Sequence, residues 1–414
     1  GSIRWDLSTL SGPNSKYQNK PLWSVGGSWN IYKEKFFQAD FVDMLKLRAS
    51  YGIGGNIGRN TAPYLIASYY DSSLVDGMAG SVNTPPNKDI RWEKTTTVNV
   101  GVDFALFRHR LSGTIEYYNK YSVDLLAAIN GSPTQGFGYT TLMTNNGKMV
   151  NRGVEITLSG EIIRQKDFSW NASLLYAFNR NKVKHISVQP SLWDSRISMP
   201  TSYPMVGKPL YGIYAYKWAG LNENGDPQVY DAENNVTSGP ARDYHALVYC
   251  GTTVPIHNAS LTNVLRYKGF EFSAMLILDA GHKLRSSNIP SINMSNGRIT
   301  STAKGIVDRW TQPGDVTDVP RLLFSNDTEN FNTHRTELYR YSDLFVYDAS
   351  NIRLSNISLA YRVPAHWCKK ISLSGARLQF NVENVATFAF DSKANYDLGG
   401  KVKPNYVWGL YLNF

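Results

Sequence analysis

One short segment carries the residue types of a calcium-binding loop. Residues 222–226 read Asn-Glu-Asn-Gly-Asp, and Glu233 stands at the twelfth position counted from Asn222. Amide and carboxylate oxygens are the ligands that calcium prefers. However, Pro227 stands at the sixth position, where such a loop needs glycine, and no helical pattern flanks the segment. The pattern therefore favours a β-turn over a calcium site.

Catalytic chemistry has little support in this sequence. The seven histidines are scattered, and none pairs with another at metal-ligand spacing. There is no nucleophile elbow, phosphate loop or zinc motif. Cys250 and Cys368 have no spacing motif, and nothing supports a disulfide between them. We predict no cofactor, no metal and no enzyme activity. A hydrolase with catalytic groups on its loops stays an alternative, because triads form in space.

Aromatic residues are the best candidates for ligand contact. They make up 13% of the chain, with 26 Tyr and 10 Trp. Aromatic rings in exposed loops can stack on sugars or pack on peptide side chains. The predicted substrate-binding residues are Tyr69, Tyr70, Trp193, Tyr216 and Trp218. The alternative is that long loops pack on themselves; Tyr211, Tyr214, Tyr216 and Trp218 alternate and also fit a short strand.

The elements that must position these residues are β-strands with alternating polarity. Between 97 and 106, for example, Val98, Val100 and Val102 share one face, and Asn99 and Asp103 share the other. Strands of nine or more residues are typical of membrane-spanning barrels rather than of soluble sheets. The predicted strands are 1–8, 22–32, 43–53, 93–106, 111–125, 150–163, 168–182, 256–267, 270–282, 351–362, 371–384 and 404–414. In 351–362 the apolar positions change face, which predicts a β-bulge or a misplaced boundary.

The connections between the predicted strands alternate between two lengths. Short, charged turns fall at 107–110, 164–167, 266–269 and 362–364. Long segments rich in Gly, Asn, Ser and Tyr fall at 54–92, 126–149, 183–255 and 283–350. This is the layout of an outer-membrane β-barrel with short periplasmic turns and long extracellular loops. The fold class is thus predicted as all-β, a transmembrane antiparallel β-barrel, with Phe414 at the periplasmic rim.

Charge and hydropathy agree with that fold. No stretch approaches the apolar length of a membrane helix. The net charge of +10 is spread over the chain, so nucleic-acid binding is not predicted, whereas contact with anionic lipids is compatible with it. Charged residues on one strand face predict a wet or protein-filled lumen: Lys46, Arg48, Asp103, Glu116, Lys120, Glu155 and Glu161. The alternative is the solvent face of a soluble sheet.

Several short motifs, taken in order, resemble a known family. They include Leu-Lys-Leu-Arg-Ala-Ser-Tyr-Gly at 45–52, Ile-Arg-Trp-Glu-Lys at 90–94, Asn-Arg-Gly-Val-Glu at 151–155, Arg-Trp-Thr-Gln-Pro-Gly-Asp at 309–315 and Phe-Asn-Val-Glu-Asn at 380–384. Together they resemble the C-terminal barrel portion of SusC/RagA-type TonB-dependent outer-membrane transporters. One departure is Phe-Asp-Ser-Lys-Ala-Asn at 390–395, where the family often carries an acidic Asp-Pro-Glu-like stretch.

The resemblance implies an organisation larger than this chain. The barrel would have twenty-two strands, and residues 1–414 would supply about the last twelve. An upstream part would supply the plug and the segment that meets the TonB complex. The resemblance also implies a SusD-like surface lipoprotein as partner. The chain is expected to be the C-terminal portion of a longer protein, unable to insert alone because its first strand would be unpaired in lipid.

The C-terminus predicts a contact with the barrel-assembly machinery. Gly409, Leu412 and Phe414 follow the pattern of an assembly signal, a glycine and alternating apolar residues up to a terminal aromatic. A final exposed strand can pair with the machinery by strand addition. The alternative is an ordinary apolar edge strand.

The predicted function is active import of a bulky nutrient, an oligosaccharide or an oligopeptide, across the outer membrane of a Gram-negative bacterium. The ring-rich loops slightly favour glycans. A passive adhesin or structural barrel with interaction loops is the alternative, and an upstream plug with a TonB segment would separate the two.

Overall fold

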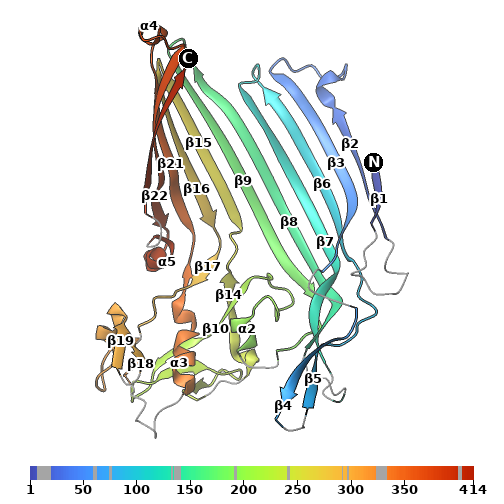
Figure 1. Cartoon of the computed structure of the whole chain (residues 1–414), viewed down its shortest axis with the longest axis vertical. Coiled ribbons are helices and arrows are strands. Elements are labelled where there is room, and N and C mark those ends of the chain that lie inside the picture. Colours follow the sequence, from blue (N-terminus) through green and yellow to red (C-terminus); the bar gives the residue numbers. More distant parts are fainter. Residues whose placement is uncertain are drawn as a thin grey trace.

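The computed structural model describes most of the chain, and the fold is dominated by one sheet. The described residues are 1–6, 20–58, 63–73, 77–131, 134, 141–190, 194–239, 243–290, 292–295, 298–322, 333–399 and 403–414. Within them, twelve strands form a single antiparallel sheet in which sequence neighbours are also spatial neighbours. Figure 1 shows these strands as one continuous wall, with short connections at one rim and long ones at the other.

All twelve predicted strands are present. Their bounds are β1 (Ser2–Asp6), β2 (Lys20–Asn30), β3 (Val42–Asn56), β6 (Glu93–Leu106), β7 (Leu111–Asn130), β8 (Thr141–Arg164), β9 (Phe168–His185), β15 (His257–Tyr267), β16 (Phe270–Ala280), β21 (Asn351–Arg362), β22 (Gly375–Ala389) and β23 (Asn405–Asn413). Three of these strands have boundaries that differ clearly from the predicted ones. β7 and β8 extend well beyond the predicted ends, and β22 starts later because the short helix α4 (Ala365–Lys369) occupies the turn before it.

The two faces of the sheet differ in chemistry, as the alternation predicts. One face, here called the apolar face, carries exposed side chains such as Val100, Ile115 and Tyr117. The register aligns Val100 with Ala49 on one side and with Tyr117 on the other. The opposite face, here called the polar face, carries Arg48, paired in register with Gly101. Apolar surface left open on a sheet of this length needs lipid to cover it.

The predicted bulge in β21 exists and keeps that face apolar. Leu354 pairs with Leu276 of β16 and Asn356 pairs with Met275, so Ser355 is the extra residue. The inserted residue shifts the alternation by one position. Ile352, Leu354, Ile357 and Leu359 consequently align with Leu278, Leu276, Ala274 and Phe272, all on the apolar face.

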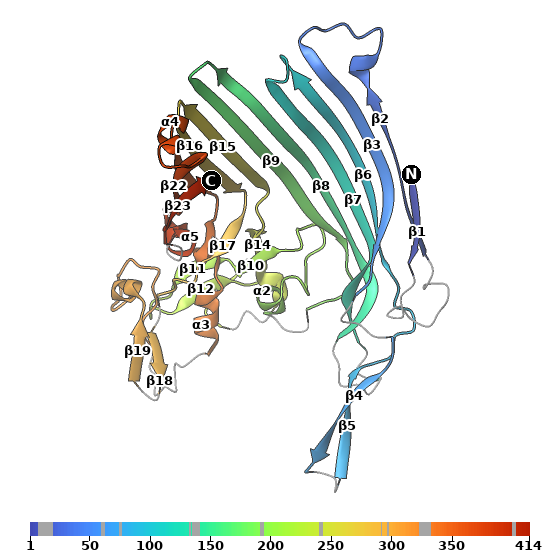
Figure 2. The ribbon, with the colours of Figure 1, turned by 45° about the horizontal axis from the view of Figure 1, so that its top comes forward.

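The long connections hold smaller elements of their own. A hairpin of β4 (Ile66–Ser72) and β5 (Gly77–Thr84) projects away from the wall (Figure 2). The other elements on this side are α2 (Ser195–Ser198), β10 (Gly212–Tyr216), β11 (Trp218–Leu221), β12 (Pro227–Tyr230), β13 (Val236–Thr237), β14 (Leu247–Thr252), β17 (Lys283–Arg285), β18 (Ile292–Ser295), β19 (Arg298–Thr302), α3 (Thr333–Arg340), β20 (Val346–Asp348) and α5 (Asn395–Gly399), with short 3-10 turns between them. None of the helices in the described residues is long and apolar enough to cross a membrane.

Residues 390–395, where the sequence departs from the acidic stretch of the resembled family, lie in a loop outside the twelve-stranded sheet. Asp391 accepts a hydrogen bond from the backbone of Lys393 and starts a single 3-10 turn. The helix α5 follows, and its Asp397 accepts hydrogen bonds from Ser286 and Ser287. The last long loop is therefore tied to the connection that follows β16.

We expect Gly153→Ala to disturb the wall, whereas Gly160→Ala in the same strand should not. A Cβ at Gly153 would lie 2.4 Å from the ring of Tyr118 and 2.5 Å from the carbonyl oxygen of Phe178. At Gly160 the nearest atom would be 3.5 Å away, an ordinary contact. Overpacking of this kind costs about 1–3 kcal/mol. The measurement is the temperature at which the full-length receptor loses its folded mobility in gel electrophoresis; equal temperatures for both variants would contradict the close packing of Tyr118 on β8.

Candidate functional site

The polar face is crossed by ion pairs between neighbouring strands. Arg48 of β3 pairs with Asp103 of β6, its Nε lying 2.9 Å from the carboxylate, and also contacts Glu116 of β7. Arg353 and Asp279 pair at 2.9 Å between β21 and β16. Towards the short-turn rim, Glu271 accepts from Arg266 at 2.7 Å and from Arg377 at 3.1 Å. The predicted lumen residues Arg48, Asp103 and Glu116 are thus brought together on one surface.

The long connections pack on one another around a small buried cluster, here called the loop core. Its buried residues are Tyr214, Tyr216, Val229, Ala246, Leu247 and Leu338. They come from β10, β12, the turn before β14, β14 itself and α3, so the core joins the connection before β15 to the one after β16. Arg285 fixes the same junction, because its guanidinium donates to the carbonyl oxygens of Tyr214 at 2.6 Å and Ser342 at 3.3 Å.

A cluster of three ionised residues also joins the two connections that form the loop core. The Asp226 carboxylate accepts from Arg321 at 3.1 Å and from Arg335 of α3 at 2.6 Å. Burial alone would raise the pKa of Asp226, but the hydrogen bonds from the two arginines hold it below its ordinary value. Burial lowers the pKa of Arg335, yet a guanidinium stays protonated throughout the physiological range. The cluster is therefore ionic on both sides.

The turn at 222–226 positions Asp226 within this ion cluster. The side-chain oxygen of Asn222 accepts from the backbone N–H groups of Asn224 and Asp226, each at 2.9 Å, which makes the predicted β-turn between β11 and β12. Gly225 has a φ of +72°, and a Cβ there would lie 2.4 Å from the ring of Trp310. The residues that resemble a calcium loop thus hold Asp226 in contact with Arg321 and Arg335. In the described residues no group of His, Cys, Asp and Glu could hold a metal ion.

The five predicted ligand-binding rings do not form one site. Tyr69 and Tyr70 are 71% and 54% exposed on the projecting β4–β5 hairpin. Trp193 lies outside the described residues. Tyr216 is 0% exposed and belongs to the loop core, so a ligand-binding role for it stays a prediction that its burial does not favour. Trp218 is half-buried, and its indole N–H donates to Asp318 at 3.1 Å.

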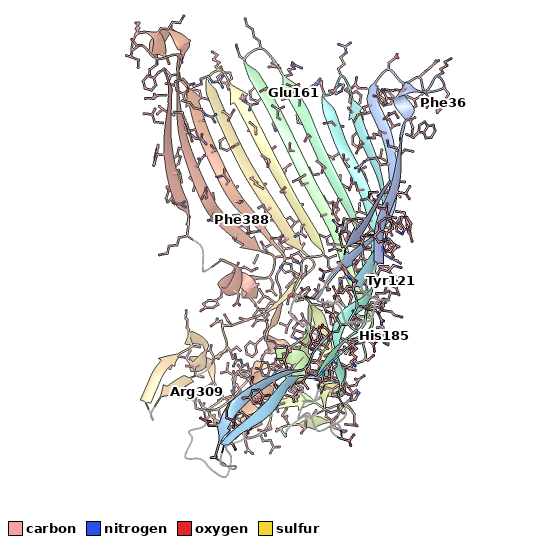
Figure 3. The ribbon with its side chains drawn as sticks, turned by 45° about the vertical axis from the view of Figure 1, so that its right-hand side comes forward. Phe36, Tyr121, Glu161, His185, Arg309 and Phe388 are labelled. Carbon is pink, nitrogen blue, oxygen red and sulfur yellow. The ribbon has the colours of Figure 1, made fainter. Side chains whose placement is uncertain are left out.

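A cavity of about 340 Å³ lies where β7, β8 and β9 extend beyond the rest of the sheet. Its lining is mostly apolar, with Glu93, Lys148 and His185 as the charged or titratable members. Figure 3 places His185 beyond Tyr121, at the end of the sheet nearest the loops. Met149 and Val183 line the cavity and are register partners in β8 and β9. Leu125 and Leu126 line the cavity at a register shift between β7 and β8 that follows Asp124, whose φ is +56°. Sequence reasoning did not predict this irregularity and therefore missed the cavity.

Long antiparallel strands, a lipid-compatible outer face, an ion-paired inner face and a folded loop layer on one rim define an outer-membrane β-barrel. Residues 1–385 match the family model described as TonB dependent receptor-like, beta-barrel. The chain belongs to this family of receptors, which places it in the outer membrane of a Gram-negative bacterium.

Relatives of known name agree with this assignment. The chain is 27% identical to TonB-dependent receptor P3 of Formosa agariphila, over 99% of this chain and 42% of the relative. It is 25% identical to TonB-dependent receptor SusC of Bacteroides thetaiotaomicron, over 92% of this chain and 38% of the relative. A solved structure of the RagAB peptide transporter superposes with a TM-score of 0.79 at 23% identity, over 100% of this chain and 45% of that one. This chain therefore spans less than half the length of these proteins.

Proposed function

We propose that this chain forms the C-terminal wall and external loops of an active importer for oligosaccharides or oligopeptides. The observation that carries the proposal is the loop core. It joins two long connections into one folded layer on the rim that carries the long loops. Below it, the polar face carries ion pairs between neighbouring strands. A ligand held at the rim would thus meet a hydrophilic path.

The remaining parts of the importer are proposed from family resemblance. About ten further strands would close the barrel. A plug in the lumen, moved by the TonB complex, would open the path, and a SusD-like lipoprotein would cover the loops. The names of the relatives support this arrangement, since SusC is a TonB-dependent receptor and RagAB is a peptide transporter. The chain itself would bind and guide the ligand without changing it chemically.

The substrate class is best decided by uptake. A deletion strain carrying the full-length receptor gene would be supplied with labelled oligosaccharides and labelled oligopeptides of matched size. We expect uptake of one class, and we expect it to stop when the TonB segment is removed. Uptake that survives this removal would favour the passive barrel. Uptake of neither class, together with unchanged cell adhesion to a surface, would contradict both.

We also propose that Gly409, Leu412 and Phe414 form the signal read by the barrel-assembly machinery. β23 is the last strand of the described sheet and pairs with β22, and a strand at this position can be recognised by strand addition before the barrel closes. Phe414 is 92% exposed, so it adds nothing to packing within this chain. Phe414→Ala should lower the amount of receptor in the outer membrane several-fold, whereas Asn413→Ala, on the polar side of the same strand, should not. Immunoblots of outer-membrane fractions measure this, and equal levels would exclude the signal.

A further inference from the structure

The apolar face of β9 ends abruptly in cations. Its six outward positions from Phe168 to Phe178 are Phe168, Trp170, Ala172, Leu174, Tyr176 and Phe178. The next two outward positions are Arg180 and Lys182, and both are exposed. Six alternate positions at about 3.3 Å per residue, in a tilted strand, match the apolar band of about 25 Å that a barrel presents to lipid. The cations therefore begin where the hydrocarbon ends.

The neighbouring strands add to this patch. Arg152 of β8 is the register partner of Arg180, and Val150 is the partner of Lys182. On the other side, Arg152 is the partner of Asn119 in β7, and its Nε donates to the Asn119 side chain at 3.2 Å. Directly opposed side chains in a sheet lie about 5 Å apart. Arg152, Arg180 and Lys182, here called the basic patch, thus form one surface.

Within the described strands β8, β9 and β15, no carboxylate lies on the same face as the basic patch. The two carboxylates of β8, Glu155 and Glu161, lie on the polar face, and β9 and β15 contain none. Arg180 and Lys182 make no ion pair with any described residue. On a surface that merely needs solubility both signs of charge would serve equally well. A patch of one sign, with Arg favoured, fits a ligand rich in phosphate.

Rings just before the patch fix its depth in the membrane. Tyr176 and His257 are joined by a 2.9 Å hydrogen bond, and His257 also packs on Phe178. Polar-tipped rings of this kind gather at the boundary between acyl chains and headgroups. Arg180 and Lys182 follow Phe178 along the strand towards the long-loop rim. They consequently lie in the headgroup layer of the outer leaflet.

We propose that the basic patch binds the phosphate groups of the lipid A part of lipopolysaccharide in the outer leaflet. The acyl chains of that lipid would lie along the apolar face of β9. Its phosphates would accept hydrogen bonds from the two guanidinium groups and from the ammonium group of Lys182. The site faces lipid and not the lumen, so it is separate from the nutrient path.

The test is lipid binding by the detergent-purified full-length receptor. Thermal stabilisation would be titrated with phosphorylated lipid A, with dephosphorylated lipid A and with inorganic phosphate. The test variant is Arg180→Gln combined with Lys182→Gln. The control is Lys46→Gln combined with Lys120→Gln, which removes the same charge from the polar face; Lys120 is also exposed and follows Asn119 in β7.

We expect phosphorylated lipid A to stabilise the native receptor and the control, and to bind the test variant about tenfold more weakly. The difference should shrink at high salt. The proposal is overturned if the test variant binds as well as the control. It is also overturned if dephosphorylated lipid A binds equally well, or if inorganic phosphate alone reproduces the stabilisation.

Discussion

Replacing Asp226 by alanine is expected to lower the free energy required to open the loop core by about 3 kcal/mol. The substitution leaves Arg321 and Arg335 facing each other without the carboxylate that both contact, at 3.1 Å and 2.6 Å. Removing one member of a largely buried ion cluster costs several kcal/mol, because the remaining charges stay desolvated. The strands of the wall should be unaffected, since the cluster lies in the loops.

Hydrogen exchange of the full-length receptor measures this opening directly. Amides of β12 and α3 should exchange faster by about two orders of magnitude in the variant. Glu233→Ala is the matched control, because Glu233 is an exposed acid close by in the same connection. If both variants exchange alike, the ion cluster does not hold the loop core.

The same opening should appear on acidification. The pKa of Asp226 is depressed in the folded protein, so its stabilising effect is complete above the ordinary carboxyl pKa of about 4. It is lost as the pH falls below that value and through the lower folded pKa. Exchange in β12, corrected for the intrinsic rate, should therefore rise only below about pH 4. In Asp226→Asn this acid-dependent step should be missing.

Tyr216→Ala is the second substitution with a large expected effect. The Tyr216 ring is fully buried and belongs to the loop core together with Val229 and Leu338. Truncating a buried aromatic residue costs about 3–5 kcal/mol through lost contacts and the cavity that remains. Limited proteolysis of the folded receptor should then cut between β10 and β14 while the wall stays intact.

Tyr211→Ala provides the comparison for Tyr216. Tyr211 immediately precedes β10 and is half exposed, so its truncation should leave the proteolysis pattern close to that of the native receptor. A ligand-binding role for Tyr216 makes a different prediction, because the variant would lose substrate while its loops stayed protected. That outcome would contradict the loop-core interpretation.

The wall could be predicted from the sequence because the residue pattern within each strand is sufficient to identify that strand. Period-two alternation shows which residues face lipid, and the two lengths of connection show which rim they belong to. Even the bulge in β21 was visible, since Leu354 and Ile357 cannot share a face without an extra residue between them. These signals are local, because contact with lipid favours apolar residues at the outward positions of every strand.

The loop layer could not be predicted in the same way. Tyr69 and Tyr216 are both tyrosines in polar connections, yet one is exposed and the other fully buried. Tyr216 is buried because it belongs to the loop core, which also includes Leu338, a residue far away in sequence. The partners of Asp226 are equally remote, because both arginines follow β16. Only the alternation of Tyr214 and Tyr216 hinted at β10.

The loop core also constrains the order of folding. Tyr216 precedes β15 and Leu338 follows β16, so the core cannot close until this hairpin has joined the wall. A slip of the hairpin by one residue would displace one connection by about 3.3 Å against the other. Asp226 would then lose Arg335. With the correct strand register, the external loops would pack into the loop core. A barrel with the wrong register would keep its loops unpacked, and proteases at the cell surface would cleave it.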